Sequence, residues 1–320
     1  PAYNAADTIE RALNSVYAQT YENIIEVIVV DDGSTDSTVE IIRDKFPDVK
    51  LIEQENQGSP TARNRGVAEA TGEYIAFLDD DDEWLPEKTA VQMQCFMKHN
   101  GLRMTIADVF WMDKDILVDE QHDAATTLVE PLLFTHVFPE MDFPYGCSGW
   151  MLDRDLFERS GGFLRHMRRS QDAELLWRIL LDGYSVARVR HPLLHRYPSH
   201  TRRSSEDWAA MRRTSYQGLA PVVTEVACLA SQDCGMLTHS QASRRVAAFH
   251  LSAAWLLIDV GECDLGRESL AAAAALPGGS IALRIGLAAA RLSPRVAYRF
   301  RRFLGKLMRH LTFVARLGRT

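Results

Sequence analysis

The sequence of 320 residues is poor in cysteine, and its five cysteines follow no paired spacing. This distribution argues against a disulfide framework and against a zinc site, and it fits a reducing compartment such as the cytoplasm. The sequence also has no apolar run of about 18 residues, so we predict no membrane span. Both common glycine-rich phosphate motifs are missing, which excludes the usual dinucleotide-binding and P-loop classes. A bound diphosphate would therefore need another source of positive charge.

Acidic side chains are absent from residues 269–320, which contain ten lysine and arginine residues. The whole chain has 36 basic and 43 acidic side chains, so the net charge of −7 conceals an acidic body and a basic end. Residues 294–320 alternate apolar and basic side chains at helical spacing. This pattern predicts an amphipathic helix that lies either on an anionic membrane surface or on the acidic body. No recognition motif accompanies the charge, so we predict no nucleic-acid partner.

The first 80 residues contain short apolar runs that alternate with helical patterns. We predict strands over residues 24–30, 49–52 and 72–78, with helices over residues 5–18, 60–70 and a stretch ending at Phe46. Such alternation predicts βαβ units and a parallel sheet, in which ligands bind at the carboxyl ends of the strands. After residue 205 the strand pattern stops, and we predict helices over residues 206–230, 240–260, 264–276, 280–290 and 294–317.

Polar clusters stand where the parallel topology would gather them at one edge of the sheet. They are Tyr3-Asn4, Asp31-Asp32-Gly33-Ser34, Asn56-Gln57-Gly58 and the four consecutive carboxylates Asp79, Asp80, Asp81 and Asp82, hereafter the aspartate run. Two carboxylates about 4 Å apart repel by about 4 kcal/mol at an effective dielectric near 20. A divalent cation would remove this conflict. The alternative is a solvated acidic turn that caps the next helix, and Asp31 and Asp32 could likewise cap a helix or accept from a ribose or base.

In order and spacing, these segments resemble glycosyltransferase family 2, whose members are nucleotide-sugar-dependent, inverting enzymes of the GT-A fold. The matching segments are Pro1-Ala2-Tyr3-Asn4, Val30 to Asp36, Asn56-Gln57-Gly58 with Ala62 to Gly66, and Gly72 to Asp82. The resemblance covers residues 1–205 and implies an α/β catalytic domain with a Rossmann-like, mostly parallel sheet flanked by helices. Residues 206–320 would form a helical C-terminal region. Since the family has an apolar strand before the Pro-x-Tyr-Asn segment, we expect about one strand to precede Pro1.

The resemblance also implies roles for individual residues. Asp79 and Asp81 match the Asp-x-Asp pair that would hold Mn²⁺ or Mg²⁺, and Asp82 is a rival because a run of four leaves the register open. The residues expected around the nucleotide sugar are Tyr3, Asn4, Asp31, Asp32, Gly58, Arg63, Asp79 and Asp80. Further candidates to reach the metal or the diphosphate are His195, Arg196 and His200.

Asp172 follows Gln171 at the start of a predicted helix. Taken alone, it is typical of a helix N-cap. In the family, the aspartate of this segment is the catalytic base, and a sugar hydroxyl needs such a base to become a good nucleophile. Cys147 has no histidine beside it in the sequence, so we interpret it as a small packed thiol.

These residues favour an inverting glycosyltransferase that moves a sugar from a nucleoside-diphosphate sugar, by expectation a UDP-sugar, to a hydroxyl of a glycan or lipid-linked acceptor. The expected location is the cytoplasm, with peripheral contact at the inner face of the cell membrane through residues 294–320. Two alternatives remain open at the level of the sequence. One is a nucleotidyltransferase, and the other is an inactive module that binds a sugar nucleotide.

Overall fold

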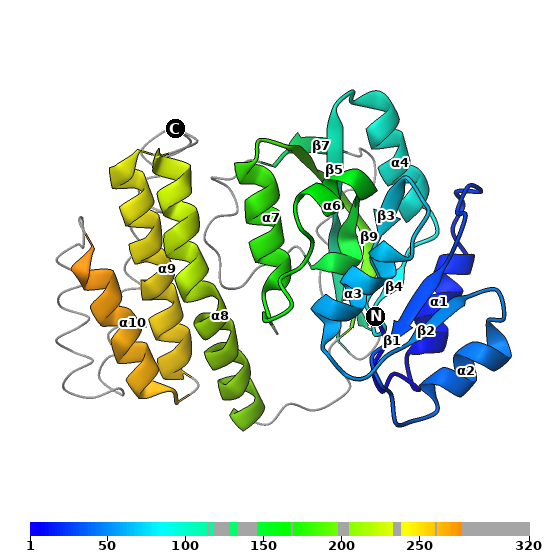
Figure 1. Ribbon diagram of the computed structural model, residues 1–320, viewed down its shortest axis with the longest axis horizontal. Helices are drawn as coiled ribbons and strands as arrows, with labels where there is room; N and C mark the ends of the chain where they lie inside the picture. The colour runs from blue at the N-terminus through cyan, green and yellow to red at the C-terminus, as the bar shows by residue number, and fades with distance from the viewer. Residues whose placement is uncertain are drawn as a thin grey trace. The chain divides into compact units, whose positions relative to one another are not determined.

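The computed structural model describes residues 1–113, 116–117, 128–132, 146–167, 169–197, 205–232, 238–259 and 261–276. The described residues up to 197 belong to one compact unit, and those from 205 onward belong to a second (Figure 1). The helices predicted over residues 280–290 and 294–317 lie outside the described residues. The boundary predicted at residue 205 remains a prediction.

The alternation predicted for the first 80 residues is confirmed. The elements are α1 (Ile9–Tyr17), β1 (Ile28–Asp31), α2 (Thr38–Lys45), β2 (Lys50–Glu53), α3 (Ser59–Ala68) and β3 (Tyr74–Ala76). Strands β1 and β2 pair in parallel, with Val29 opposite Leu51. Helix α1 buries Ile9 and Leu13 against Val29 and α2, because apolar residues spaced three and four apart share one helix face.

The remaining strands form a seven-stranded sheet in the order β3-β8-β5-β9-β4, with β6 on β5 and β7 on β9. Its further elements are β4 (Glu83–Trp84), α4 (Lys88–Lys98), β5 (Leu102–Asp113), β6 (Ile116–Leu117), β7 (Leu128–Pro131), a 3₁₀ turn η1 (Cys147–Gly149), β8 (Trp150–Asp153), α6 (Arg154–Arg159), α7 (Gln171–Leu181) and β9 (Ser185–Arg196). Figure 1 shows the helices flanking this sheet, so the predicted α/β class is confirmed.

The prediction of a mostly parallel sheet is wrong for the larger sheet. There β5 and β9 pair in parallel, but β8 pairs with β3 and β5, β9 with β4 and β7, and β5 with β6, all in antiparallel register. In the pair of β3 with β8, Ile75 lies opposite Leu152. A short buried run such as residues 74–76 is compatible with either direction, because its apolar pattern does not depend on its partner. Sequence periodicity therefore predicts that the strand exists, but it does not predict which strand pairs with it.

Strand β9 runs through Pro192, although proline cannot donate a ladder hydrogen bond. In the structure β9 continues to Arg196, and the pairing register with β5 shifts between Ala107 and Asp108, so that Pro192 lies opposite Asp108. A bulge is one of the few places where a strand accommodates proline.

The second unit contains α8 (Ser205–Gln232), α9 (His239–Asp259) and α10 (Cys263–Ala275), which confirms the three helices predicted there. Helix α10 packs on α9 through Leu270, which meets Ala254 and Ile258. The described residues include no helix that is both long and apolar enough to span a membrane.

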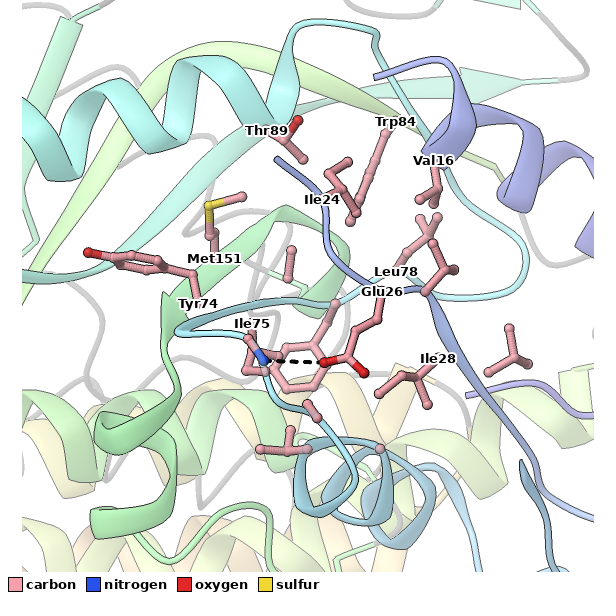
Figure 2. Close-up of a pocket in the computed structure, with 18 of the residues that line it drawn as sticks. Val16, Ile24, Glu26, Ile28, Tyr74, Ile75, Leu78, Trp84, Thr89 and Met151 are labelled. Atoms are coloured by element: carbon pink, nitrogen blue, oxygen red, sulfur yellow. Dashed lines mark hydrogen bonds between the residues drawn. The ribbon is translucent and has the colours of Figure 1, made fainter. Parts of the chain in front are cut away.

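A cavity of about 510 Å³ lies between β1 and β3 and is lined mainly by apolar side chains, among them Ile28 and Ile75 (Figure 2). At one end of the same β1 edge, Ala2 pairs in parallel with Asp31.

Lys88, at the start of α4, is fully buried. Its Nζ donates to Oε1 of Gln92 (2.7 Å) and lies 4.1 Å from the centre of the Trp84 ring. Burial lowers the pKa of Lys88 to about 7 from its ordinary 10.5. Between these two values the unfolded chain binds one proton more than the folded protein, so the free energy of unfolding should rise with pH across that window.

We therefore expect Lys88→Met to flatten the pH dependence of stability. Relative to this variant, the wild-type free energy of unfolding should rise by about 1 kcal/mol per pH unit between about pH 7.5 and 9.5, as measured by urea denaturation. Lys98→Met removes an exposed lysine of the same helix and should leave the wild-type slope intact. Parallel curves for the wild type and Lys88→Met would show that Lys88 stays charged in the folded protein.

Candidate functional site

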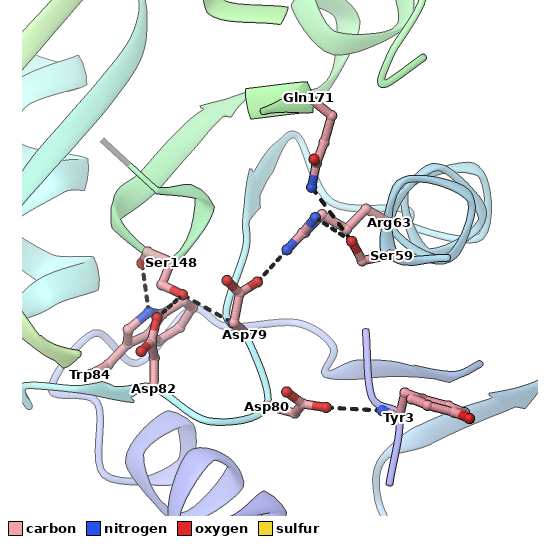
Figure 3. A network of polar contacts seen from close by, with 9 residues as sticks. All are labelled: Tyr3, Ser59, Arg63, Asp79, Asp80, Asp82, Trp84, Ser148 and Gln171. Carbon is pink, nitrogen blue, oxygen red and sulfur yellow. Dashed lines mark hydrogen bonds and ion pairs between the residues drawn. The ribbon is translucent and has the colours of Figure 1, made fainter. Parts of the chain in front are cut away.

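The aspartate run follows β3 as a tight turn, in which the Asp82 N–H donates to the Asp79 carbonyl (3.2 Å). Three of its carboxylates have different partners (Figure 3). Asp79 forms an ion pair with Arg63 of α3, and Asp80 Oδ2 accepts from the Tyr3 N–H (2.9 Å). Asp82 Oδ2 accepts from Ser148 Oγ (2.6 Å), and the Asp82 side chain is buried. The run is thus a folded turn in which each carboxylate has its own environment.

Asp81 differs from its neighbours. Its backbone carbonyl accepts from Nη2 of Arg11 (2.8 Å), and this guanidinium also lies 3.8 Å from the centre of the Tyr197 ring. In the part of the chain that the structure describes, no side chain of another residue binds the Asp81 carboxylate by a hydrogen bond or ion pair. Burial and the neighbouring Asp79 raise the pKa of Asp81. This carboxylate is therefore the member of the run most available to a cation.

Arg63 provides fixed positive charge beside the run. Its side chain is only 6% exposed, and it lies over the Phe163 ring at 5.6 Å. Burial is the largest single effect and works against its charge, but Asp79 and the other acidic neighbours together outweigh it, so the pKa of Arg63 lies above its ordinary value. Its Nε atom is buried without a hydrogen-bond partner among the described residues, so Arg63 has a donor left for a ligand.

Asp172 is the second residue of α7, after Ser170, which adopts a left-handed conformation at the N-cap. Its Oδ1 accepts from the Ala173 N–H (2.9 Å). Burial raises the pKa of Asp172 and Asp79 adds to the effect, whereas Arg63 and Arg196 oppose it. A carboxylate from the second half of the domain thus shares its electrostatic environment with the aspartate run.

The two neighbouring candidates on β9 point to opposite faces, as alternation along a strand requires. Arg196 interacts electrostatically with Asp82, Asp79 and Asp172, which together keep its pKa above the ordinary value despite burial. His195 instead lies beside Glu83, with 3.4 Å between Nδ1 and Oε2. The sequence could not predict which of these two residues lies near the aspartate run. His200 lies outside the described residues.

The polar residues expected around the nucleotide fall into two groups. Asp31 and Asp32 are buried, and their carboxylates accept from backbone N–H groups: Asp31 from Ser34 (3.0 Å), and Asp32 from Gln57 and Gly58 (both 2.8 Å). These hydrogen bonds stabilise the turns after β1 and β2. A ligand that binds either carboxylate would therefore compete with the backbone N–H donors. Their binding role remains a prediction.

Tyr3 and Asn4 lie in the more open group. The Tyr3 side chain is 48% exposed, and its backbone binds Asp80. Asn4 has a positive φ of 49°, which asparagine tolerates better than most residues, and its Oδ1 accepts from the Thr35 N–H (2.8 Å). The loop before α1 is thereby tied to the turn after β1 on one side and to the aspartate run on the other.

The sequence did not predict a role at the site for Ser148 or Arg11, and it indicated only a structural role for Cys147. Ser148 binds Asp79 and Asp82, and its only sequence signal is a run of small residues before β8. Arg11 is one of the two charged residues of α1, and neither has a distinctive sequence context. Cys147 is buried, and burial raises the pKa of its thiol, which agrees with the packed-thiol interpretation.

The donor set limits what kind of metal site could form. Among the described residues there is no cluster of three or more histidine, cysteine or acidic side chains arranged to hold a metal. Hard divalent cations such as Mg²⁺ are often held by one or two carboxylates together with substrate phosphates. Asp81, with Asp79 as a second carboxylate, fits a site of that type.

The chain is similar in sequence to several proteins that are named as glycosyltransferases. YibD, an uncharacterized glycosyltransferase of Escherichia coli, is 45% identical over 89 residues, a match that covers 27% of this chain and 26% of YibD. Bacillus subtilis TuaG, whose name assigns it to teichuronic acid biosynthesis, is 30% identical over 67% of this chain and 83% of its own. The E. coli UDP-Glc:alpha-D-GlcNAc-diphosphoundecaprenol beta-1,3-glucosyltransferase WfaP is 39% identical over 37% of this chain and 46% of WfaP.

Solved structures share the fold. Residues 1–349 of S. aureus TarS in complex with UDP superpose with a TM-score of 0.61 at 17% identity, covering 93% of this chain and 87% of that one. The mannosyltransferase PcManGT from Pyrobaculum calidifontis, in complex with GDP-Man and Mn²⁺, gives 0.55 at 23% identity, covering 90% and 76%. The sequence model of glycosyl transferase family 2 matches residues 1–161, about half of the chain. The chain belongs to glycosyl transferase family 2, and its fold is that of the GT-A glycosyltransferases.

Proposed function

We propose that the protein is an inverting glycosyltransferase that transfers a sugar from a nucleoside-diphosphate sugar to an acceptor hydroxyl, with Asp172 as the general base. The observation that carries the proposal is the shared environment of Asp172, Arg63, Arg196 and Asp79, residues far apart in the sequence. A base on one side and cations and carboxylates on the other are what displacement of a diphosphate from a sugar requires.

In the proposed reaction, the acceptor oxygen attacks the anomeric carbon while the Asp172 carboxylate accepts the hydroxyl proton. The bond between the anomeric carbon and the diphosphate oxygen breaks, and the leaving nucleoside diphosphate keeps the electron pair. Single displacement inverts the anomeric configuration. The raised pKa of Asp172 suits this role, because a more basic carboxylate is a better proton acceptor.

The positive charges near the leaving group have a complementary role. Arg63 and Arg196 would offset charge that develops on the diphosphate. A bound Mn²⁺ or Mg²⁺ would add Lewis-acid stabilisation of the same charge, with Asp81 and then Asp79 as the residues that would hold it. Arg63 already pairs with Asp79, so Asp81 is the better first ligand.

We further propose a UDP-sugar donor and a glycan or lipid-linked acceptor, as in cell-envelope polysaccharide synthesis. The donor is supported by TarS, which was solved with UDP, and by WfaP, whose name specifies UDP-Glc. The same name specifies a diphosphoundecaprenol-linked acceptor. PcManGT was solved with GDP-Man, so GDP-sugars belong in any test.

The test is a screen of UDP- and GDP-sugars for Mn²⁺-dependent release of nucleoside diphosphate, in which protein treated with EDTA serves as the metal-free control. We expect turnover with at least one donor and its loss in EDTA. Release of inorganic pyrophosphate from a nucleoside triphosphate and a sugar phosphate would instead favour a nucleotidyltransferase. Binding of a sugar nucleotide without turnover, with acceptors supplied, would favour an inactive binding module.

We also propose that residues 294–320 bring the protein to an anionic membrane surface on the cytoplasmic side. Deletion of residues 294–320 should abolish flotation with liposomes that contain anionic phospholipid, because basic residues near such a surface contribute about 1 kcal/mol each. Neutral liposomes provide the control. Equal flotation of the full chain and the deletion variant on anionic liposomes would reject the proposal.

A further inference from the structure

The hydroxyl of Ser148 links two members of the aspartate run. It accepts a hydrogen bond from the Asp79 N–H (3.0 Å) and donates one to Asp82 Oδ2 (2.6 Å) (Figure 3). A serine hydroxyl has one proton to donate and lone pairs to accept, so a single side chain can make both bonds at once. Ser148 and Asp82 are each only 2% exposed, which leaves little access for water to replace either bond.

Ser148 itself is held firmly by its backbone. Its carbonyl accepts from Nε1 of Trp84 (2.9 Å), and the next carbonyl, that of Gly149, accepts from Nε2 of Gln92 (2.9 Å). A Cβ on Gly149 would lie 2.9 Å from the Ala107 carbonyl oxygen, so the turn is packed directly against β5. The hydroxyl therefore projects from a firmly held 3₁₀ turn before β8 toward the acidic side chains of the aspartate run.

We propose that Ser148 is the positioning residue that fixes the register of the aspartate run. By holding Asp82 in the interior, it reserves the Asp81 carboxylate for a divalent cation. The inference rests on the proposed function, because it assumes that the run holds a metal with the nucleotide. It goes beyond that function in naming which carboxylate is withheld from the cation and which side chain withholds it.

Loss of the hydroxyl would have two linked effects. The Asp79 N–H would lose its acceptor, and Asp82 would lose the Ser148 donor in a place where Asp79 and Asp81 already disfavour its charged form. The turn could then relax by turning Asp82 away from the sheet, which would alter the place of Asp81. Outer-shell groups that orient metal ligands typically affect metal affinity by about 10- to 100-fold.

The experiment measures Mn²⁺ binding to the full chain by electron paramagnetic resonance of free Mn²⁺, in the presence of UDP, together with thermal unfolding. Ser148→Ala should weaken Mn²⁺ affinity by about tenfold or more. Ser15→Ala is the matched control. Ser15 is also buried, donates to the Ala12 carbonyl (2.7 Å) and accepts from the Trp84 N–H (3.1 Å), but it binds no aspartate. It should lower the unfolding temperature without changing Mn²⁺ affinity.

A second variant keeps the test decisive if Ser148→Ala does not fold. Ser148→Cys keeps the side-chain shape but donates more weakly, and it should bind Mn²⁺ with intermediate affinity. In an Asp82→Asn background, Ser148→Ala should cost less affinity than in the wild type, because the two residues act as one unit. Loss of all Mn²⁺ binding in Asp82→Asn alone would identify Asp82 as a ligand and overturn the proposal.

The remaining outcomes separate this inference from the proposed function. Mn²⁺ affinity that is equal in the wild type, Ser148→Ala and Ser15→Ala would overturn the positioning role and leave the metal-assisted reaction intact. If the wild type binds no Mn²⁺ with UDP present, the metal part of the proposed function is wrong, and the role of Ser148 falls with it.

Discussion

Asp172→Asn is expected to lower kcat for sugar transfer by about 100- to 10,000-fold, the usual contribution of a general base. Asparagine has the size of aspartate but cannot take up a proton at neutral pH. Asp172 forms no ion pair with the described residues that the change would remove, and the amide oxygen can still accept from the Ala173 N–H. Folding and the Kd for UDP should therefore change little. Initial rates with saturating donor, together with UDP titration, would provide both quantities.

The chain offers a matched control for this variant. Asp155 is the second residue of α6, as Asp172 is of α7, and it pairs with Arg103 and Arg159 at the surface. Asp155→Asn should leave kcat unchanged. If Asp172→Asn keeps wild-type kcat in the same assay, Asp172 is only a helix-terminal residue and another group accepts the proton.

The pH dependence of kcat provides a second, independent test of Asp172 as the general base. Burial raises the pKa of Asp172, so the carboxylate becomes protonated, and unable to act as a base, at a higher pH than an ordinary aspartate. The acid limb of kcat should therefore lie above the usual range for aspartate, near pH 4, with activity lost as the pH falls through it. In Asp172→Asn, the remaining activity should lack this limb.

Asp81→Ala is expected to weaken Mn²⁺-dependent UDP binding by about tenfold or more without destabilising the protein. The Asp81 carboxylate is half-buried near Asp79 and has no side-chain hydrogen-bond or ion-pair partner among the described residues, so its removal relieves repulsion. Isothermal titration with UDP should show the loss only when Mn²⁺ is present. Without metal, the wild type and the variant should bind UDP alike.

Asp79→Ala should behave differently, and the contrast tests the register of the run. Its removal leaves the Arg63 guanidinium buried without its ion-pair partner, and loss of one member of a buried pair costs about 3–5 kcal/mol. We therefore expect a large fall in the unfolding temperature in addition to weaker binding. If Asp79→Ala is stable and Asp81→Ala unfolds, the two aspartates have the opposite roles.

Much of the fold could be predicted from local patterns. Helix α1 and strands β1 and β2 follow from the spacing of their apolar residues, and the three helices after residue 205 follow from theirs. The local patterns could not predict which strands pair with each other in the sheet. Strand β3 pairs with β8, about 75 residues later, and the choice depends on contacts that no local window contains. The continuation of β9 past Pro192 depends likewise on a bulge formed with β5.

In the candidate site, too, some residues could be predicted from the sequence and others could not. The aspartate run stands out by itself, because four consecutive carboxylates after a strand have few purely structural reasons to occur together. Arg63 and Asp172 were indicated by the resemblance to the family, since a charged residue on a helix or at its start is ordinary when taken alone. Ser148 and Arg11 do not stand out, because one hydroxyl or one surface-type cation acquires its role only when folding brings a carboxylate or carbonyl to it. Whether His195 or Arg196 lies near the aspartates depends on which face of β9 is turned toward them. That face is set by the register between β4 and β9, in which Glu83 lies opposite His195.

The most direct test of the proposed site is a crystal structure of the protein with UDP and Mn²⁺, with data collected at a wavelength that gives an anomalous signal for manganese. We expect one anomalous peak between the UDP diphosphate and the Asp81 carboxylate, with Asp82 still bound to Ser148 and Arg63 beside the diphosphate. UDP bound elsewhere, or manganese bound to Asp82 instead of Asp81, would contradict the arrangement proposed for this glycosyl transferase family 2 protein.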